Sequence, residues 1–193
     1  VDILIGTQSV TKGYHFPGVT LVGVVWADLN MHFPIYNAVE TTIQQLIQVA
    51  GRAGRQSEKS QVIIQCFDQH EAFNYLNEEK YQQFYEYEIR NRTKISYPPV
   101  AFLADVEMRS MNQEQVASES QELVDLLQKV AEDNDLKVDV LGPVPAVVSR
   151  IKSVYIQKIF LKGEDRMAMI NLFQAASQES FSSSVFFTMN PVS

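Results

Sequence analysis

The chain has 193 residues, of which 46% are hydrophobic and 20% are charged, and its formal net charge at pH 7 is −7. This is the composition of an ordinary globular protein, and the length suits two modest domains or one ordinary domain. The acidic balance argues against a nucleic-acid surface that covers the whole molecule. No apolar run is long enough to span a bilayer and no signal peptide is seen, so we expect a cytoplasmic protein without a membrane partner.

Cysteine and histidine usage predicts no metal centre. Cys66 is the only cysteine and stands in the apolar run Val62–Cys66, so we expect a buried strand residue in a reducing compartment. The three histidines, at positions 15, 32 and 70, are scattered and lack the spacing of metal ligands.

The first half of the chain predicts part of a parallel α/β sheet. Apolar runs predict strands near 2–6, 19–26 and 61–66, and the first two runs are nearly continuous, as in strands that are covered on both faces. Apolar residues recur at helical spacing near 38–50. Strand, strand, helix and strand in this order suit part of a RecA-like lobe, and a complete lobe would need more strands. We therefore expect a piece of a longer protein, as the direct opening of Val1 into a strand also suggests.

Polar residues follow the first two predicted strands. Thr7, Gln8, Lys12 and Gly13 lie in the loop after the first strand, at the kind of sheet edge where α/β proteins bind ligands. Asp28 follows the second strand and is a weaker candidate, because an acid at a strand end can simply be a cap or a solvated residue.

The octapeptide Gln48–Arg55 ends the predicted helix of the first half. Its arginines, Arg52 and Arg55, are three residues apart and so share one side of a helical turn, and Gly51 and Gly54 leave space beside them. Planar guanidinium groups give several charge-assisted hydrogen bonds to a phosphate in transfer. The alternative is a helix C-terminus with glycine caps and cations near the negative end of the helix dipole.

A long helix is predicted from about His70 to Arg92. Its aromatic residues are either a platform for stacked bases or packing against neighbouring elements, and we favour packing because several glutamates among them would repel phosphates. Tyr97–Pro99 ends the helix, since proline cannot continue it. We therefore predict domains at 1–96 and 97–193.

The second domain is predicted to be a small α+β fold. Residues 102–109 alternate between apolar and charged side chains, as in a half-buried strand, and Asn112 can cap the helix that follows. Further elements are expected as strands near 136–141 and 154–161, a helix near 165–178 and a strand near 183–189. The order β-α-β-β-α-β is the split β-α-β, or ferredoxin-like, arrangement.

The stretch from Lys137 to Lys162 has five cations and one acid. Within it, the segment Gly142–Ser153 is predicted to be a long, proline-rich loop that carries Arg150 and Lys152. These two residues are candidates for contact with DNA or with an acidic partner, and the alternative is an ordinary solvated face.

Several of these segments resemble a known family of enzymes. Gly6–Gln8 with Lys12 and Gly13 is similar to the fifth motif of the superfamily-two helicases, and Gln48–Arg55 is similar to the sixth. Their combination, together with Phe16-Pro17, resembles the family of primosomal replication-restart DNA helicases.

Later segments extend the resemblance over nearly the whole chain. Tyr97–Pro99 and Leu141–Ala146 are similar to landmarks in the C-terminal part of that family. The sequence departs from the family at His15 and Asn190, where members carry Asp, and at Ile156, where Arg is usual. The departures at Ile156 and Asn190 weaken any transfer of C-terminal DNA or partner contacts to these positions.

The resemblance implies roles for particular residues. Arg52 and Arg55, beside Gly51, would contact the γ-phosphate of ATP, and Gln48 would position that phosphate or the attacking water. The residues implied to couple nucleotide state to DNA are Thr7, Gln8, Lys12 and Gly13. The implied cofactors are ATP and Mg²⁺, and the implied partners are DNA forks, single-stranded DNA, single-strand-binding protein and primosome proteins.

The chain lacks the glycine-rich phosphate loop and the acidic magnesium motif of such helicases. We therefore expect these 193 residues alone to be inactive in ATP hydrolysis. The zinc module of the family is cysteine-rich, so it is expected outside this sequence. The alternatives are another superfamily-two translocase and a non-catalytic module that binds DNA or the acidic tail of a single-strand-binding protein.

Overall fold

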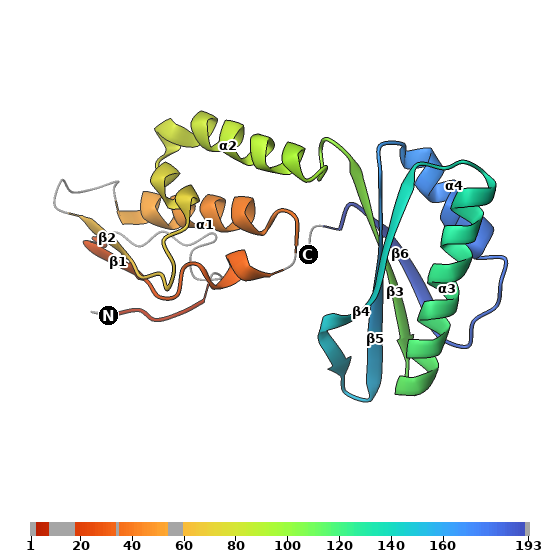
Figure 1. The fold of residues 1–193 in the computed structure, drawn as a ribbon. Coiled ribbons are helices and arrows are strands. Elements are labelled where there is room, and N and C mark those ends of the chain that lie inside the picture. Colours follow the sequence, from red (N-terminus) through yellow and green to blue (C-terminus); the bar gives the residue numbers. More distant parts are fainter. Residues whose placement is uncertain (1–2, 8–17, 34, 54–59, 192–193) are drawn as a thin grey trace. The chain divides into compact units, whose positions relative to one another are not determined.

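The structure, a computed structural model, describes residues 3–7, 18–33, 35–53 and 60–191 (Figure 1). The chain divides into two compact units, Val1–Arg90 and Asn91–Ser193. The sequence-based boundary at Tyr97 lies a few residues beyond this division. Each unit has its own buried core.

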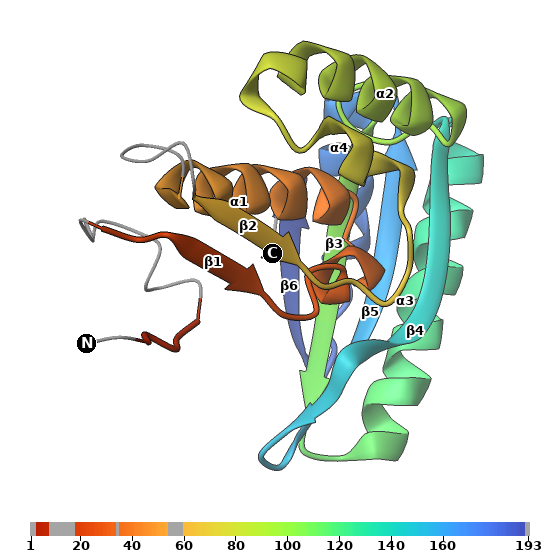
Figure 2. The same cartoon turned by 90° about the vertical axis from the view of Figure 1, so that its left-hand side faces the viewer.

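The first unit is built on a parallel strand pair with a helical crossover. β1 (Leu21–Val24) pairs in parallel with β2 (Gln61–Ile64). The chain between them forms the short 3-10 helix η2 (Leu29–His32) and the helix α1 (Ala38–Ala53), which lies over the two strands (Figure 2). A parallel pair requires such a crossover, and the helix predicted near 38–50 is confirmed.

Two expectations for the strands of this unit are wrong. Residues 3–7 form no strand, and Ile3 and Ile5 are 79% and 90% exposed. The first two strands were also expected to be covered on both faces, but Leu21 of β1 is 57% exposed. The physical reason is that apolar, β-branched residues favour a strand only where a neighbouring strand can accept their backbone hydrogen bonds.

The prediction of one long helix from His70 to Arg92 is also wrong, because three shorter helices take its place. They are the 3-10 helices η3 (Glu71–Tyr75) and η4 (Glu78–Lys80), followed by α2 (Tyr81–Lys94). The His70 side chain accepts a hydrogen bond from the Ala72 N–H at 3.2 Å, and Asn77 Oδ1 accepts one from the Glu79 N–H at 3.0 Å. Each of these side chains caps the start of a separate helix, so the segment cannot continue as one long helix.

Aromatic side chains fill the core of the first unit. Phe84 of α2 is buried together with Ile43 of α1 and Ala72 of η3. The ring of Tyr75 lies 6.2 Å from that of Phe84 and 5.5 Å from that of Tyr87, between ring centroids. Tyr75, Phe84 and Tyr87 therefore pack between elements as expected, whereas Tyr81 and Tyr85 are 40% and 52% exposed.

The second unit has the predicted order β-α-β-β-α-β. Its elements are β3 (Phe102–Ser110), α3 (Gln113–Asp133), β4 (Val138–Ile151), β5 (Val154–Gly163), α4 (Arg166–Ala176) and β6 (Ser184–Met189). The strands form one sheet in the order β4-β5-β3-β6, and every neighbouring pair is antiparallel. Both helices lie on the same face of this sheet (Figure 1).

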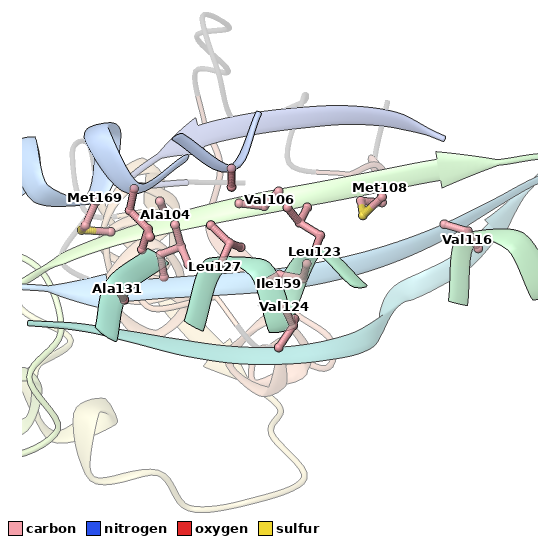
Figure 3. Packing of buried hydrophobic residues seen from close by; sticks show 13 residues of the cluster. Ala104, Val106, Met108, Val116, Leu123, Val124, Leu127, Ala131, Ile159 and Met169 are labelled. Atoms are coloured by element: carbon pink, nitrogen blue, oxygen red, sulfur yellow. The ribbon is translucent and has the colours of Figure 1, made fainter. Parts of the chain in front are cut away.

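The main core lies between this sheet and its two helices (Figure 3). Ala104, Val106 and Met108 alternate along β3 and are fully buried, as the period-two pattern predicts. Leu123 and Leu127 of α3 point toward them. The predicted cap is confirmed as well, since Asn112 Oδ1 accepts hydrogen bonds from the N–H groups of Glu114 and Gln115.

Asn190, just after β6, adds two further hydrogen bonds between this end of the chain and β3. Its N–H donates to Leu103 O at 2.6 Å, and its Oδ1 accepts from the Leu103 N–H at 3.0 Å. Its φ of +48° is one that asparagine and aspartate adopt more readily than other residues with a side chain. The family carries Asp here by resemblance, and its carboxylate could accept the same bond, so the departure is compatible with this fold.

The long loop predicted at Gly142–Ser153 is wrong, because β4 continues to Ile151. Only Lys152 and Ser153 then connect β4 to β5. β4 is an edge strand with β5 as its single neighbour, and edge strands tolerate prolines that lack an N–H donor. Gly142 has a φ of +113°, and a Cβ atom there would lie 2.9 Å from Lys158 O, so this position requires glycine.

Candidate functional site

Asp28 ties together the loops that follow β1 and β2. Its Oδ2 accepts hydrogen bonds from the N–H groups of Phe67 and Asp68, at 3.0 and 2.8 Å, and the residue is only 1% exposed. The hydrogen bond from Asp68 is the main cause that lowers the pKa of Asp28, against the opposing effect of burial. Asp28 is therefore not a solvated residue, and it fixes the carboxyl-terminal edge of the parallel pair.

The second oxygen of Asp28 is also buried. Within the part of the chain that the structure describes, Asp28 Oδ1 has no hydrogen-bond partner. His32 approaches the other oxygen, with 3.8 Å between its Nε2 and Asp28 Oδ2. The two backbone N–H groups thus donate to only one oxygen of the carboxylate, Oδ2.

The helicase-like motifs are described only in part. Thr7 is exposed and lies in no helix or strand, while Gln8, Lys12 and Gly13 fall outside the described residues. Arg55 also falls outside them, and of Arg52 only the backbone, in α1, is described. The roles implied for these side chains stay predictions.

Two members of the octapeptide can be placed on α1. Gln48 is exposed, and its side chain makes no hydrogen bond within the described residues. A Cβ atom built on Gly51 would lie 3.9 Å from Glu78 Oε1, which is an ordinary contact. Among the described residues, no atom therefore approaches Gly51 so closely that glycine is required, and the carboxylate of Glu78 is its neighbour.

The β4–β5 hairpin carries the two cations singled out from the sequence. Its tip, residues 144–155, hereafter the hairpin tip, includes Arg150 on β4 and Lys152 in the turn. Arg150 Nε donates to Lys152 O at 3.2 Å, and the Arg150 guanidinium carbon lies 5.0 Å from the centroid of the Tyr155 ring. These contacts order the Arg150 side chain along the hairpin while it remains exposed.

The other cations of the basic stretch on β5 are neutralised by acids. Lys158 bonds to Asp105 and lies 3.6 Å from Glu107, and Lys162 Nζ lies 3.8 Å from Asp139 Oδ2. Sequence alternation predicted that Asp105 would face solvent, but it is 6% exposed. The reason is that it lies beside Lys158 on the neighbouring strand.

Among the cations of β4, β5 and the turn between them, the unpaired ones therefore lie at the hairpin tip. Among the residues that the structure describes, neither Arg150 nor Lys152 forms an ion pair. Residues 144–155 include no acid. An unneutralised pair of cations on an exposed hairpin is suited to contact a polyanion.

Sequence reasoning missed the apolar part of this tip. Val147, Val148 and Ile151 are 65%, 60% and 51% exposed, and they stand beside the two cations. Because the segment was predicted to be a loop, no prediction was made from the sequence for these three side chains. The signal that could have found them is the adjacent pair of β-branched residues, which favours a strand.

Two kinds of feature are absent from the described part of the chain. No group of three or more histidine, cysteine or acidic side chains is placed to hold a metal ion there. None of the described helices has the length and hydropathy of a membrane span. Cys66 is a free thiol just after β2 and is half-buried, which corrects the expectation of a buried strand residue.

This geometry defines a mixed α/β protein whose second unit is a four-stranded antiparallel sheet with two helices on one face and a basic, apolar hairpin tip. Residues 93–192 match the model of the family described as the primosomal protein N C-terminal domain. Because this match covers more than half of the chain, the chain belongs to that family. The resemblance seen in the sequence is confirmed.

The chain is also similar to curated full-length proteins. It is 36% identical over 162 residues to the replication restart protein PriA of Bacillus subtilis, and 35% and 33% identical to proteins of the same name from Synechocystis and Treponema pallidum. These alignments cover 83% or 84% of this chain but only 19 to 24% of the relatives. The chain thus spans about a fifth of the length of the relatives it matches.

Proposed function

We propose that the chain is the C-terminal portion of an ATP-dependent DNA helicase that reloads the replication machinery at stalled forks. The observation that carries the proposal is the identity of 36% to a replication restart protein over an alignment that covers 83% of the chain. The matches extend over four fifths of the sequence and so include much more than the C-terminal family domain.

The octapeptide is proposed to contact ATP in the complete protein. Arg52 and Arg55 would stabilise the charge that develops on the γ-phosphate, and Gln48 would orient the phosphate or the attacking water. The exposure of the Gln48 side chain is compatible with a ligand at this end of α1. ATP and Mg²⁺ would be held largely by residues outside this sequence, and so would the zinc of the family.

The motif around Thr7 is proposed to link nucleotide state to the DNA track. Thr7, Gln8, Lys12 and Gly13 carry this role by resemblance to the fifth helicase motif. The exposure of Thr7 is compatible with a contact to a DNA phosphate. Without a phosphate loop in the sequence, we propose that these 193 residues alone do not hydrolyse ATP.

We also propose finer fold assignments for the two units. The first would be part of a RecA-like lobe, which is supported by the parallel pair β1–β2 and its helical crossover α1. The second would be ferredoxin-like, which is supported by the element order and by the sheet order β4-β5-β3-β6.

The hairpin tip is proposed to contact the DNA backbone through Arg150 and Lys152. The lack of neutralising acids around these two residues supports this proposal, whereas Lys158 and Lys162 are occupied by carboxylates. Forked and single-stranded DNA are the proposed substrates. Single-strand-binding protein and primosome proteins are the proposed partners in the cytoplasm.

A genetic replacement tests the proposed role in replication restart. The change Arg55→Ala is introduced into the complete gene, and DNA synthesis is followed after replication forks are stalled by damage. We expect synthesis to resume as poorly as in a strain that lacks the gene, because the arginine finger is lost. Arg166→Ala, on an exposed helix start far from the motif in sequence, is the control and should resume normally. Normal resumption in a strain without the gene would contradict the proposal.

A further inference from the structure

The hairpin tip exposes apolar side chains that a contact with phosphates does not use. Val147, Val148 and Ile151 all have more than half of their surface open to solvent. They lie next to Arg150 and Lys152, on a hairpin whose residues 144–155 include no acid. Any partner of this surface should therefore offer negative charge and apolar area side by side.

The regular pairing of β4 with β5 is interrupted within the hairpin tip. Pro145 lies opposite Gln157, and the next pair is Arg150 opposite Tyr155. Four residues, 146–149, thus stand on β4 where β5 has only Ile156. Such a bulge leaves its extra residues outside the regular ladder and re-aims their side chains, so Val147 and Val148 are presented rather than packed.

We propose that Val147 and Val148 contact the faces of unpaired bases in DNA, while Arg150 and Lys152 hold the adjacent phosphates. This inference rests on the proposed DNA contact of the hairpin tip. Proteins that unstack DNA commonly place apolar side chains beside cations in this way. The Arg150–Tyr155 pair adds an ordered guanidinium–aromatic surface of the kind on which bases stack.

The chemistry of DNA makes this proposal specific. In a duplex, base faces are stacked and closed to side chains, whereas phosphates are accessible in duplex and single strand alike. Contacts from Arg150 and Lys152 therefore bind both forms and weaken with salt. Contacts from Val147 and Val148 contribute binding free energy only with unpaired bases, and this contribution does not depend on salt. The hairpin tip should thus prefer DNA with an unpaired arm.

The test compares two DNA probes for their binding to the 193-residue chain. One probe is a labelled duplex of mixed sequence, and the other is the same duplex with an unpaired single-stranded arm. The variant is the double change Val147→Thr and Val148→Thr, which keeps side-chain shape and strand propensity. Met111→Thr, at an exposed methionine outside the hairpin, is the matched control. Thermal melting of each variant verifies that the fold is retained.

We expect the double variant to lose about tenfold in affinity for the armed probe, because two apolar contacts with the bases are lost, with duplex affinity and the salt slope unchanged. An unchanged preference for the armed probe would overturn the inference and leave the phosphate contact standing. A chain that binds neither probe would overturn the proposed DNA contact itself. Binding of an acidic, apolar-ended peptide in place of DNA would likewise overturn the inference and assign the hairpin tip to a protein partner.

Discussion

Asp28 shows how a single buried carboxylate can organise a sheet edge. Two backbone N–H groups from the loop after β2 donate to one of its oxygens, so the loops after β1 and β2 are held together. Sequence reasoning identified Asp28 as a polar residue at a strand end. It could not identify the partners, because Phe67 and Asp68 are about forty residues away and come close only through the parallel pairing.

This arrangement predicts how Asp28 contributes to stability as pH changes. Its pKa in the folded chain is lowered from an ordinary value of 3.8, so the ionised form is favoured by folding. The contribution is therefore complete above the unfolded pKa and is lost as pH falls through the lower, folded pKa. Comparing the melting temperatures of the wild type and Asp28→Asn should show a wild-type advantage at neutral pH that shrinks below about pH 4. An advantage that grows with acidity would contradict the assigned direction.

At the scale of elements, the sequence predicted those with a strong period and missed those that local caps or edge pairing determine. α1, β3 and α3 follow from regular apolar spacing. The side chains of His70 and Asn77 divide the expected long helix, which is a local competition that periodicity does not reveal. The part of β4 from Gly142 onward was predicted to be a loop because of its prolines, which an edge strand tolerates.

The same limits apply to the hairpin tip as a candidate site. The excess of cations identified Arg150 and Lys152 from the sequence, since charge can be counted without a fold. The pairing of Lys158 with Asp105 joins residues on different strands, so only the structure shows that the excess remains at the tip. The exposure of Val147 depends on the bulge in β4 and was beyond sequence reasoning for the same reason.

Charge reversal at the hairpin tip makes a direct prediction. With both Arg150→Glu and Lys152→Glu, we expect DNA affinity to fall and the slope of log affinity against log salt to decrease by about two, one for each lost phosphate contact. Arg150→Glu and Lys152→Glu are also made singly, and Lys129→Glu, on the exposed side of α3, changes the net charge by the same amount as each of them and is their control. An equal loss of affinity in the control would mean that net charge alone controls binding.

At the scale of the whole chain, the two lines of evidence for function fall mainly on different units. The helicase-like motifs stand in residues 6–55, within the first unit, whereas the family model matches residues 93–192 of the second. The alignments to replication restart proteins cover most of the chain and connect the two. A chance match to one short motif would not produce this agreement.

The most direct test of the helicase assignment is ATP hydrolysis by the purified complete protein, with and without forked DNA. Wild-type protein is compared with Arg55→Ala, and ATP binding is measured separately for both. We predict that forked DNA strongly stimulates turnover in the wild type, and that the variant still binds ATP but loses turnover by about a thousandfold or more. Fork-stimulated turnover that is unchanged in Arg55→Ala would mean that Gln48–Arg55 is only a helix end, and turnover absent from the wild type would contradict the helicase assignment itself.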